Sequence, residues 1–164
     1  MKFAIIAAGE GSRLAEEGIS APKPLIPLCG TAMIERLVRI FAANDAEEIV
    51  IIVNRLRPET ESFVRRLADE HPEWHLRIEV ETTPSSMHSF ARIAPLLDGA
   101  PFCLTTVDTI FREEDFRAYI AAFRAALEAG LDGLMAVTDF IDDESPLYIG
   151  TDEALNIDGF YDTR

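Results

Sequence analysis

Short apolar runs alternate with longer amphipathic segments along most of the chain. Each run is rich in Ile, Val and Leu and has the length of a buried strand. Strands are therefore predicted for residues 3–8, 48–53, 76–81, 102–107 and 134–138. Between these runs, apolar residues recur every three or four positions, which predicts helices that cover the strands.

The helical segments carry recognisable start signals. Residues 33–41 follow Thr31, a candidate N-cap, and residues 58–70 begin with proline and carry acidic residues in the first turn. A further helix is predicted for residues 112–129. Another carries Phe90, Ile93 and Leu97.

The alternation of strands and helices predicts an α/β fold. It indicates a Rossmann-like three-layer αβα sandwich with a mainly parallel mixed sheet. A chain of 164 residues, 48% of them hydrophobic, can bury a sizeable core, so we expect one domain over residues 1–164.

Composition excludes some classes of partner. The net charge is −14, from 29 acidic and 15 basic residues, which argues against nucleic-acid binding through charge. No apolar run has the length of a membrane span or a secretory signal, so we expect a cytoplasmic protein without a membrane partner. A homo-oligomer is left open. Cys29 and Cys103 are expected to be small buried residues in a reducing compartment.

Ligands of parallel α/β sheets bind at the carboxyl ends of the strands. Three predicted loops should open there, residues 9–28, 82–89 and 108–111. The first contains Gly9 and Gly11, then Arg13, and later Lys23 between two prolines. Glycine-rich turns expose backbone N–H groups to phosphates, and the two cations add charge beside them. The strongly negative chain would also need a divalent metal to hold a polyphosphate, which predicts Mg²⁺.

The first loop does not fit two common phosphate-binding motifs. Leu14 stands where a dinucleotide fingerprint has its third glycine, and Gly-Lys-Ser/Thr is absent. Gly-Glu-Gly-Ser-Arg-Leu followed by Pro-Lys-Pro closely resembles the signature of the sugar-1-phosphate nucleotidyltransferases, which include glucose-1-phosphate thymidylyltransferases and mannose-1-phosphate guanylyltransferases. Asp108 resembles the strand-end aspartate of this family, and residues 146–150 resemble, more loosely, a region near its acceptor.

The resemblance implies an enzyme that transfers an NMP from an NTP to a sugar 1-phosphate or similar phosphorylated alcohol. Pyrophosphate would leave, and Mg²⁺ would be required. Arg13, Lys23 and Asp108 would be catalytic, with Asp108 as the metal ligand. The nucleotide would contact Ala7, Ala8, Gly9, Gly11, Ser12, Arg13, Lys23 and Ser86. Gly150 and Asp162, the latter after a Gly159-Phe160 turn, would contact the acceptor substrate.

Each of these features also has a structural explanation, which stays open. Gly9 and Gly11 would suit any tight turn, and Asp108 could cap the next helix. Ser85 or Ser86 could cap the helix that carries Phe90, and residues 146–150 could form a turn into an edge strand. A non-catalytic nucleotide-binding or regulatory module is the alternative function.

Members of the family are commonly longer, and their later part supplies a second metal-binding aspartate. The chain stops near the point where that part would begin. We therefore expect a C-terminally truncated nucleotidyltransferase domain, and neither the nucleobase nor the acceptor can be assigned from the sequence.

Overall fold

The computed structural model describes residues 1–9, 21–140 and 146–163. The chain divides into two compact units, Met1–Ile120 and Ala121–Arg164. The first unit is built on a four-stranded sheet, and the second contains a two-stranded hairpin. No helix in the described part of the chain is long and apolar enough to cross a membrane.

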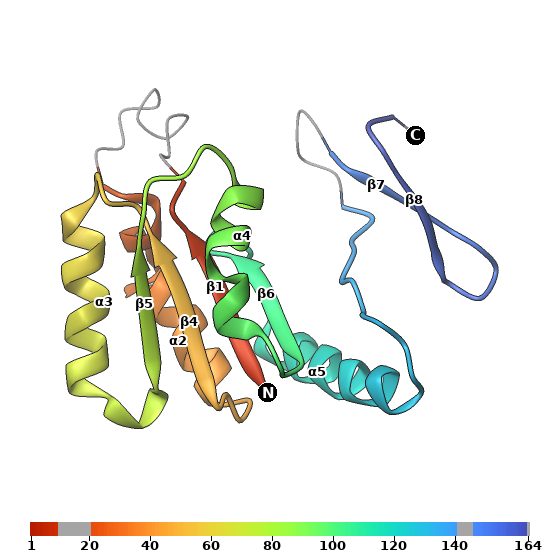
Figure 1. Cartoon of the computed structure of the whole chain (residues 1–164), viewed down its shortest axis with the longest axis horizontal. Coiled ribbons are helices and arrows are strands. Elements are labelled where there is room, and N and C mark those ends of the chain that lie inside the picture. The colour runs from red at the N-terminus through yellow and green to blue at the C-terminus, as the bar shows by residue number, and fades with distance from the viewer. Residues whose placement is uncertain (10–20, 141–145, 164) are drawn as a thin grey trace. The chain divides into compact units, whose positions relative to one another are not determined.

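The main sheet is parallel throughout its described pairings. It consists of β1 (Lys2–Ala7), β4 (Glu48–Val53), β5 (Leu76–Val80) and β6 (Phe102–Thr106), in the order β5-β4-β1-β6. Four of the five predicted strands are thus confirmed. Figure 1 shows the four arrows side by side, with helices in front of the sheet and behind it.

Helices cover both faces because the strands are apolar on both faces. In β1, Phe3, Ile5 and Ala7 pack into one cluster and Ala4 and Ile6 into another. The first cluster includes residues of α2 (Met33–Ala42), α3 (Pro58–Glu70) and α5 (Glu113–Glu128), and the second includes residues of α4 (Ser86–Leu97). This arrangement confirms the predicted Rossmann-like layers. Parallel strands buried on both sides need continuous apolar runs, which these sequences provide.

The strand order places a switch point beside β1. The chain moves from β1 to β4 and β5 on one side, then returns to β6 on the other side of β1. The carboxyl ends of β1 and β6 therefore meet where ligands of such sheets bind. The loops that follow β1 and β6 are the ones that carry Lys23 and Asp108.

Short elements complete the first unit. A 3-10 turn, η1 (Lys23–Leu25), leads into an antiparallel pair, β2 (Pro27–Leu28) and β3 (Thr31–Ala32), and a second 3-10 turn, η2 (Pro72–Trp74), precedes β5. Thr31 does not cap α2 as predicted, because it belongs to β3 and Ala32 occupies the cap position without a side-chain hydrogen bond. Cys103 is buried as expected, but Cys29 is exposed in the turn between β2 and β3.

In the second unit, the prediction of a strand over residues 134–138 is wrong. These residues have no regular secondary structure, and Leu134, Met135 and Val137 are exposed. An apolar run becomes a strand only where a neighbouring strand accepts its backbone hydrogen bonds, and residues 134–138 belong to none of the sheets formed by the described residues. The unit's pairing is instead between β7 (Tyr148–Thr151) and β8 (Ile157–Tyr161), drawn in blue in Figure 1.

The connection between β7 and β8 also differs from the prediction. Gly159 and Phe160 lie within β8 and make no turn. The chain reverses before them, where the Asp152 Oδ1 accepts hydrogen bonds from the backbone N–H groups of Ala154 at 2.9 Å and Asn156 at 2.8 Å. An aspartate side chain that binds the following backbone in this way is a standard means of stabilising a turn.

Candidate nucleotide-binding site

Lys23 and Asp108 are 85 residues apart in sequence and meet at the carboxyl edge of the sheet. The Lys23 Nζ donates a hydrogen bond of 2.6 Å to the Asp108 Oδ2. The side chains retain 35% and 42% of their exposure, so both remain open to an incoming ligand. The pair joins the segment after β1 to the loop after β6, and these segments are close because β1 and β6 are neighbours in the sheet.

Two prolines place Lys23. Pro22 precedes η1 with an extended backbone, and Pro24 is buried within η1. A proline ring fixes φ, so Pro22 and Pro24 leave this segment few alternative conformations. The backbone N–H of Leu25 closes the turn on the Pro22 carbonyl at 2.8 Å. The lysine is thereby held on a rigid turn rather than on a flexible loop.

Asp108 lies in a turn directly after β6. Val107 extends the strand by donating its backbone N–H to the Ile6 carbonyl of β1, and Thr109 closes the turn on the Thr106 carbonyl. Because α5 begins only at Glu113, Asp108 does not cap the following helix, which removes that explanation for the residue. Arg36 of α2 also anchors this loop, because its side chain donates a hydrogen bond to the Phe111 carbonyl.

Asp108 is held in its ionised form. Partial burial raises its pKa, but hydrogen bonds from Lys23 and Thr106 and the positive charge of Lys23 together lower the pKa below the usual value. A carboxylate at neutral pH is a hard oxygen donor of the kind that Mg²⁺ prefers. Among the described residues, no cluster of three or more His, Cys, Asp or Glu side chains is arranged to bind a metal ion.

The structure describes some of the other residues that are predicted to contact the nucleotide. Ala7 ends β1, Ala8 is buried directly after it, and Gly9 is exposed at the same edge. Ser86 is exposed in the first turn of α4, where Ser85 is the N-cap and accepts a hydrogen bond from the backbone N–H of His88. The cap predicted for Ser85 or Ser86 therefore belongs to Ser85. Gly11, Ser12 and Arg13 lie outside the described residues.

Sequence reasoning missed Asn54, which lies at the same edge. It directly follows β4 and is 2% exposed. Its side chain binds the Ala8 carbonyl and the Thr82 hydroxyl, so it lies between the loops that follow β1 and β5. The sequence did contain a signal for this residue. Asn54 is a polar residue at the end of the apolar run Glu48–Val53, and two basic residues and a proline follow it.

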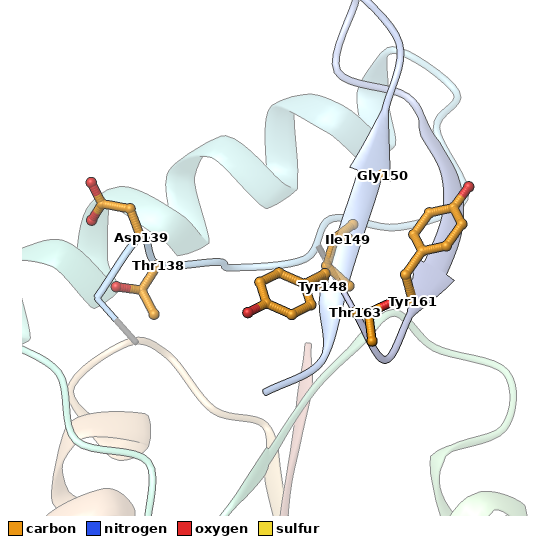
Figure 2. A pocket seen from close by; sticks show the side chains of 7 residues that line it. All are labelled: Thr138, Asp139, Tyr148, Ile149, Gly150, Tyr161 and Thr163. Carbon is orange, nitrogen blue, oxygen red and sulfur yellow. The ribbon is translucent and has the colours of Figure 1, made fainter. Parts of the chain in front are cut away.

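The predicted acceptor residues lie in the second unit. Gly150 pairs with Gly159 between β7 and β8, so residues 148–151 form a short strand, and Asp162 follows β8. Gly150 lines an open hollow of about 510 Å³, shown in Figure 2, together with Thr138, Asp139, Tyr148, Ile149, Tyr161 and Thr163. A Cβ on Gly150 would come within 2.7 Å of the Tyr161 ring, so the absence of a side chain lets this ring pack on the hairpin.

These features define an α/β domain with a lysine and a carboxylate at the carboxyl edge of its parallel sheet. Residues 3–152 match the family model of the MobA-like NTP transferase domain. The chain belongs to this family. That result confirms the resemblance to the sugar-1-phosphate nucleotidyltransferases.

Several curated proteins are similar in sequence. The mannose-1-phosphate guanyltransferases of Schizosaccharomyces pombe and Gibberella zeae are 34% and 33% identical over 84% and 73% of this chain. The CMP-5'-(3-aminopropyl)phosphonate synthase of Streptomyces rubellomurinus is 28% identical over 87% of it. The matches cover 38%, 34% and 25% of those proteins, so the chain spans well under half the length of these relatives.

Solved structures share the fold. A putative glucose-1-phosphate thymidylyltransferase from Bacillus anthracis superposes with a TM-score of 0.63 at 23% identity, covering 76% of this chain and 50% of that one. A UDP-glucose pyrophosphorylase in complex with UDP-glucose superposes with a TM-score of 0.58 at 14% identity, covering 77% and 54%. At these identities the likeness establishes the architecture alone.

Proposed function

We propose that this chain forms the nucleotide-binding part of an enzyme that transfers an NMP from an NTP to a sugar 1-phosphate or similar phosphorylated alcohol. The contact between Lys23 and Asp108 is the observation that carries the proposal. It brings a cation and an ionised carboxylate to the edge where the glycine-containing loop leaves β1. Family membership and the sugar-phosphate substrates named for two of the relatives support the same conclusion.

The reaction joins two anions, so its barrier is mainly electrostatic. An oxygen of the acceptor phosphate attacks the α-phosphorus, the bond from that phosphorus to the bridging oxygen breaks, and pyrophosphate leaves with the electron pair. No nucleophilic side chain is needed. The Lys23 ammonium would neutralise phosphate charge and orient the α-phosphate, and Arg13 would contact the outer phosphates.

Asp108 fits a role in holding Mg²⁺. Its carboxylate is ionised, half-exposed and at the carboxyl edge, and Mg²⁺ is commonly held by one or two carboxylates with phosphate oxygens and water. When bound, Mg²⁺ supplies charge neutralisation for the phosphate oxygens. Lys23 must leave Asp108 before both side chains can serve the substrate, so the pair is a resting arrangement. Gly150 and Asp162 are proposed for the acceptor side.

The test is pyrophosphate release from GTP, UTP, CTP and dTTP with Mg²⁺ and a panel of sugar 1-phosphates, measured for this chain and for any longer natural form. Lys23→Ala should abolish release and weaken NTP binding. Arg65→Ala is the matched control, because it removes one exposed cation that is paired with Glu61 on α3. NTP binding without release in both forms would favour the non-catalytic module, and unchanged binding in Lys23→Ala would contradict the proposed site.

A further inference from the structure

Asn54 connects three loops through one side chain. Its Nδ2 donates a hydrogen bond of 2.9 Å to the Ala8 carbonyl, which begins the loop after β1. Its Oδ1 accepts hydrogen bonds from the backbone N–H of Leu56 at 2.9 Å and from the Thr82 Oγ1 at 3.0 Å. Leu56 lies in the loop after β4, and Thr82 lies in the loop after β5.

The sheet explains why one residue can reach all three loops. β4 lies between β1 and β5, and the carboxyl ends of parallel strands share one edge. Val53, the last residue of β4, pairs with Ala7 in β1 and Val80 in β5. The next side chain on the middle strand is therefore the one nearest to both neighbouring loops.

The chemistry of these contacts selects asparagine. The carbonyl of Ala8 requires a donor, whereas the Leu56 N–H and the Thr82 hydroxyl require an acceptor, and an amide provides both on one short side chain. Aspartate would lose the donor and place a negative charge beside the Ala8 carbonyl. At 2% exposure, no bulk water is available to replace a lost partner, so each contact has a defined geometry.

We infer that Asn54 is a positioning residue for the nucleotide. It fixes the Ala8 end of the loop after β1 at a set distance from the Thr82 end of the loop after β5. An NTP bound across this edge would have to contact both loops at once, so their separation sets the geometry of the binding site. The inference rests on the proposed nucleotide-binding function and assigns Asn54 no contact with the reacting atoms.

The main test compares Asn54→Asp with the wild-type chain at 10 °C, with circular dichroism to check that both are folded. Asn54→Asp should weaken binding of GTP, UTP, CTP and dTTP with Mg²⁺ by about tenfold in calorimetry, because one buried donor is lost. Asn44→Asp is the matched control, since Asn44 also donates its Nδ2 to a backbone carbonyl, that of Ile40, at the end of α2. If a longer natural form turns over, KM for the NTP should rise while kcat stays within about twofold.

A second variant keeps the test open if Asn54→Asp does not fold. Thr82 is exposed, and Thr82→Val keeps its shape while removing the hydroxyl that binds Asn54. This variant should therefore fold and bind the same NTPs about threefold to tenfold more weakly. Hydrogen exchange gives a readout without nucleotide. The Leu56 amide should stay protected in Asn54→Asp, which keeps the acceptor, and exchange faster in Asn54→Ala.

The outcomes separate this inference from the proposed function. If the wild-type chain binds NTP, and Asn54→Asp and Thr82→Val bind it with the same affinity, the positioning role is overturned. The proposed function would then remain intact. Unchanged affinity in Thr82→Val would suffice if Asn54→Asp does not fold. A lower melting temperature in Asn54→Asp with wild-type affinity at 10 °C would mean a purely structural residue. Absence of NTP binding by the wild-type chain would overturn the proposed function first.

Discussion

Gly9 follows β1 at the carboxyl edge of the sheet, and the described structure gives no structural reason for a glycine there. A Cβ built on this residue meets no atom of the described structure within 4 Å, and its φ is not in the left-handed region. Within the part of the chain that the structure describes, neither packing nor backbone conformation requires glycine here. A nucleotide that approaches the backbone at the end of β1 would require it.

Gly9→Ala should accordingly leave the melting temperature nearly unchanged and weaken NTP binding by about tenfold or more. Thermal unfolding and calorimetry with GTP and UTP in the presence of Mg²⁺ measure the two quantities. Gly133→Ala is the control, because a Cβ there also meets no atom of the described structure within 4 Å. Loss of stability in Gly9→Ala, or full affinity, would contradict the assignment of Gly9 to the nucleotide.

Burial makes the stability of the fold depend on the Cys103 thiol at alkaline pH. Desolvation in the core raises its pKa to about 11. An unfolded thiol loses its proton near pH 8.5, so between about 8.5 and 11 the folded state binds more protons than the unfolded state. The contribution of the buried thiol to the free energy of unfolding is therefore fully present below pH 8.5. It is lost as the pH rises towards 11, which lowers the free energy of unfolding by about 3 kcal/mol in total.

Urea unfolding at pH 8, 9, 10 and 11 should show this decline in the wild-type chain. Cys103→Ala should be less stable at pH 8 but show a smaller decline above pH 9, because the buried titrating group is gone. At pH 8 a thiol reagent should modify the exposed Cys29 quickly and Cys103 only after unfolding. Parallel pH profiles in the two chains would refute the role assigned to Cys103.

The β2–β3 hairpin has a turn that its sequence fits only partly. Cys29 and Gly30 connect the strands with φ values of 50° and 87°. A two-residue turn with both φ values positive favours Asn-Gly, and a cysteine in left-handed backbone costs roughly 1 kcal/mol. Cys29→Asn should therefore raise the free energy of unfolding by about 0.5–1 kcal/mol, measured by urea denaturation.

Gly30→Ala provides the opposite change at the same turn. It should lower the free energy of unfolding by about 1 kcal/mol, because alanine resists this backbone conformation. Neither substitution lies in the proposed site, so NTP affinity should stay constant in both. A destabilised Cys29→Asn would indicate that the Cys29 side chain makes a favourable contact that outweighs its backbone strain.

The elements of the first unit follow closely from local sequence. The strands β1 and β4 could be predicted because each is a run of consecutive apolar residues. The start of α3 could be predicted because a proline stands there. The shorter elements were not predictable, since β2 and β3 have two residues each and depend on the hairpin between them. The run at 134–138 misled the prediction because strand formation needs a partner as well as apolar residues.

At the scale of the whole molecule, sequence predicted the edge but not the contacts across it. The rule that ligands lie at carboxyl strand ends placed Lys23 and Asp108 in the same region, although nothing local in either segment specifies a 2.6 Å ion pair. Asn54 was missed because its partners are 46 and 28 residues away, and such contacts depend on strand order. The roles of all the predicted site residues, Lys23 and Asp108 included, remain predictions.

The division of the chain at residue 120 predicts which part binds which substrate. The described residues that are predicted to contact the nucleotide all belong to the first unit. Gly150 and Asp162, which are predicted to contact the acceptor, belong to the second. A shortened chain ending at Gly130, just after α5, should therefore fold and bind GTP or UTP with Mg²⁺ within about threefold of the full chain. It should not bind mannose 1-phosphate or glucose 1-phosphate, as titration calorimetry would show.

A folded shortened chain that fails to bind NTP would mean that residues 131–164 complete the nucleotide site, because all of the first unit would still be present. Acceptor binding by the shortened chain would instead remove Gly150 and Asp162 from the acceptor site.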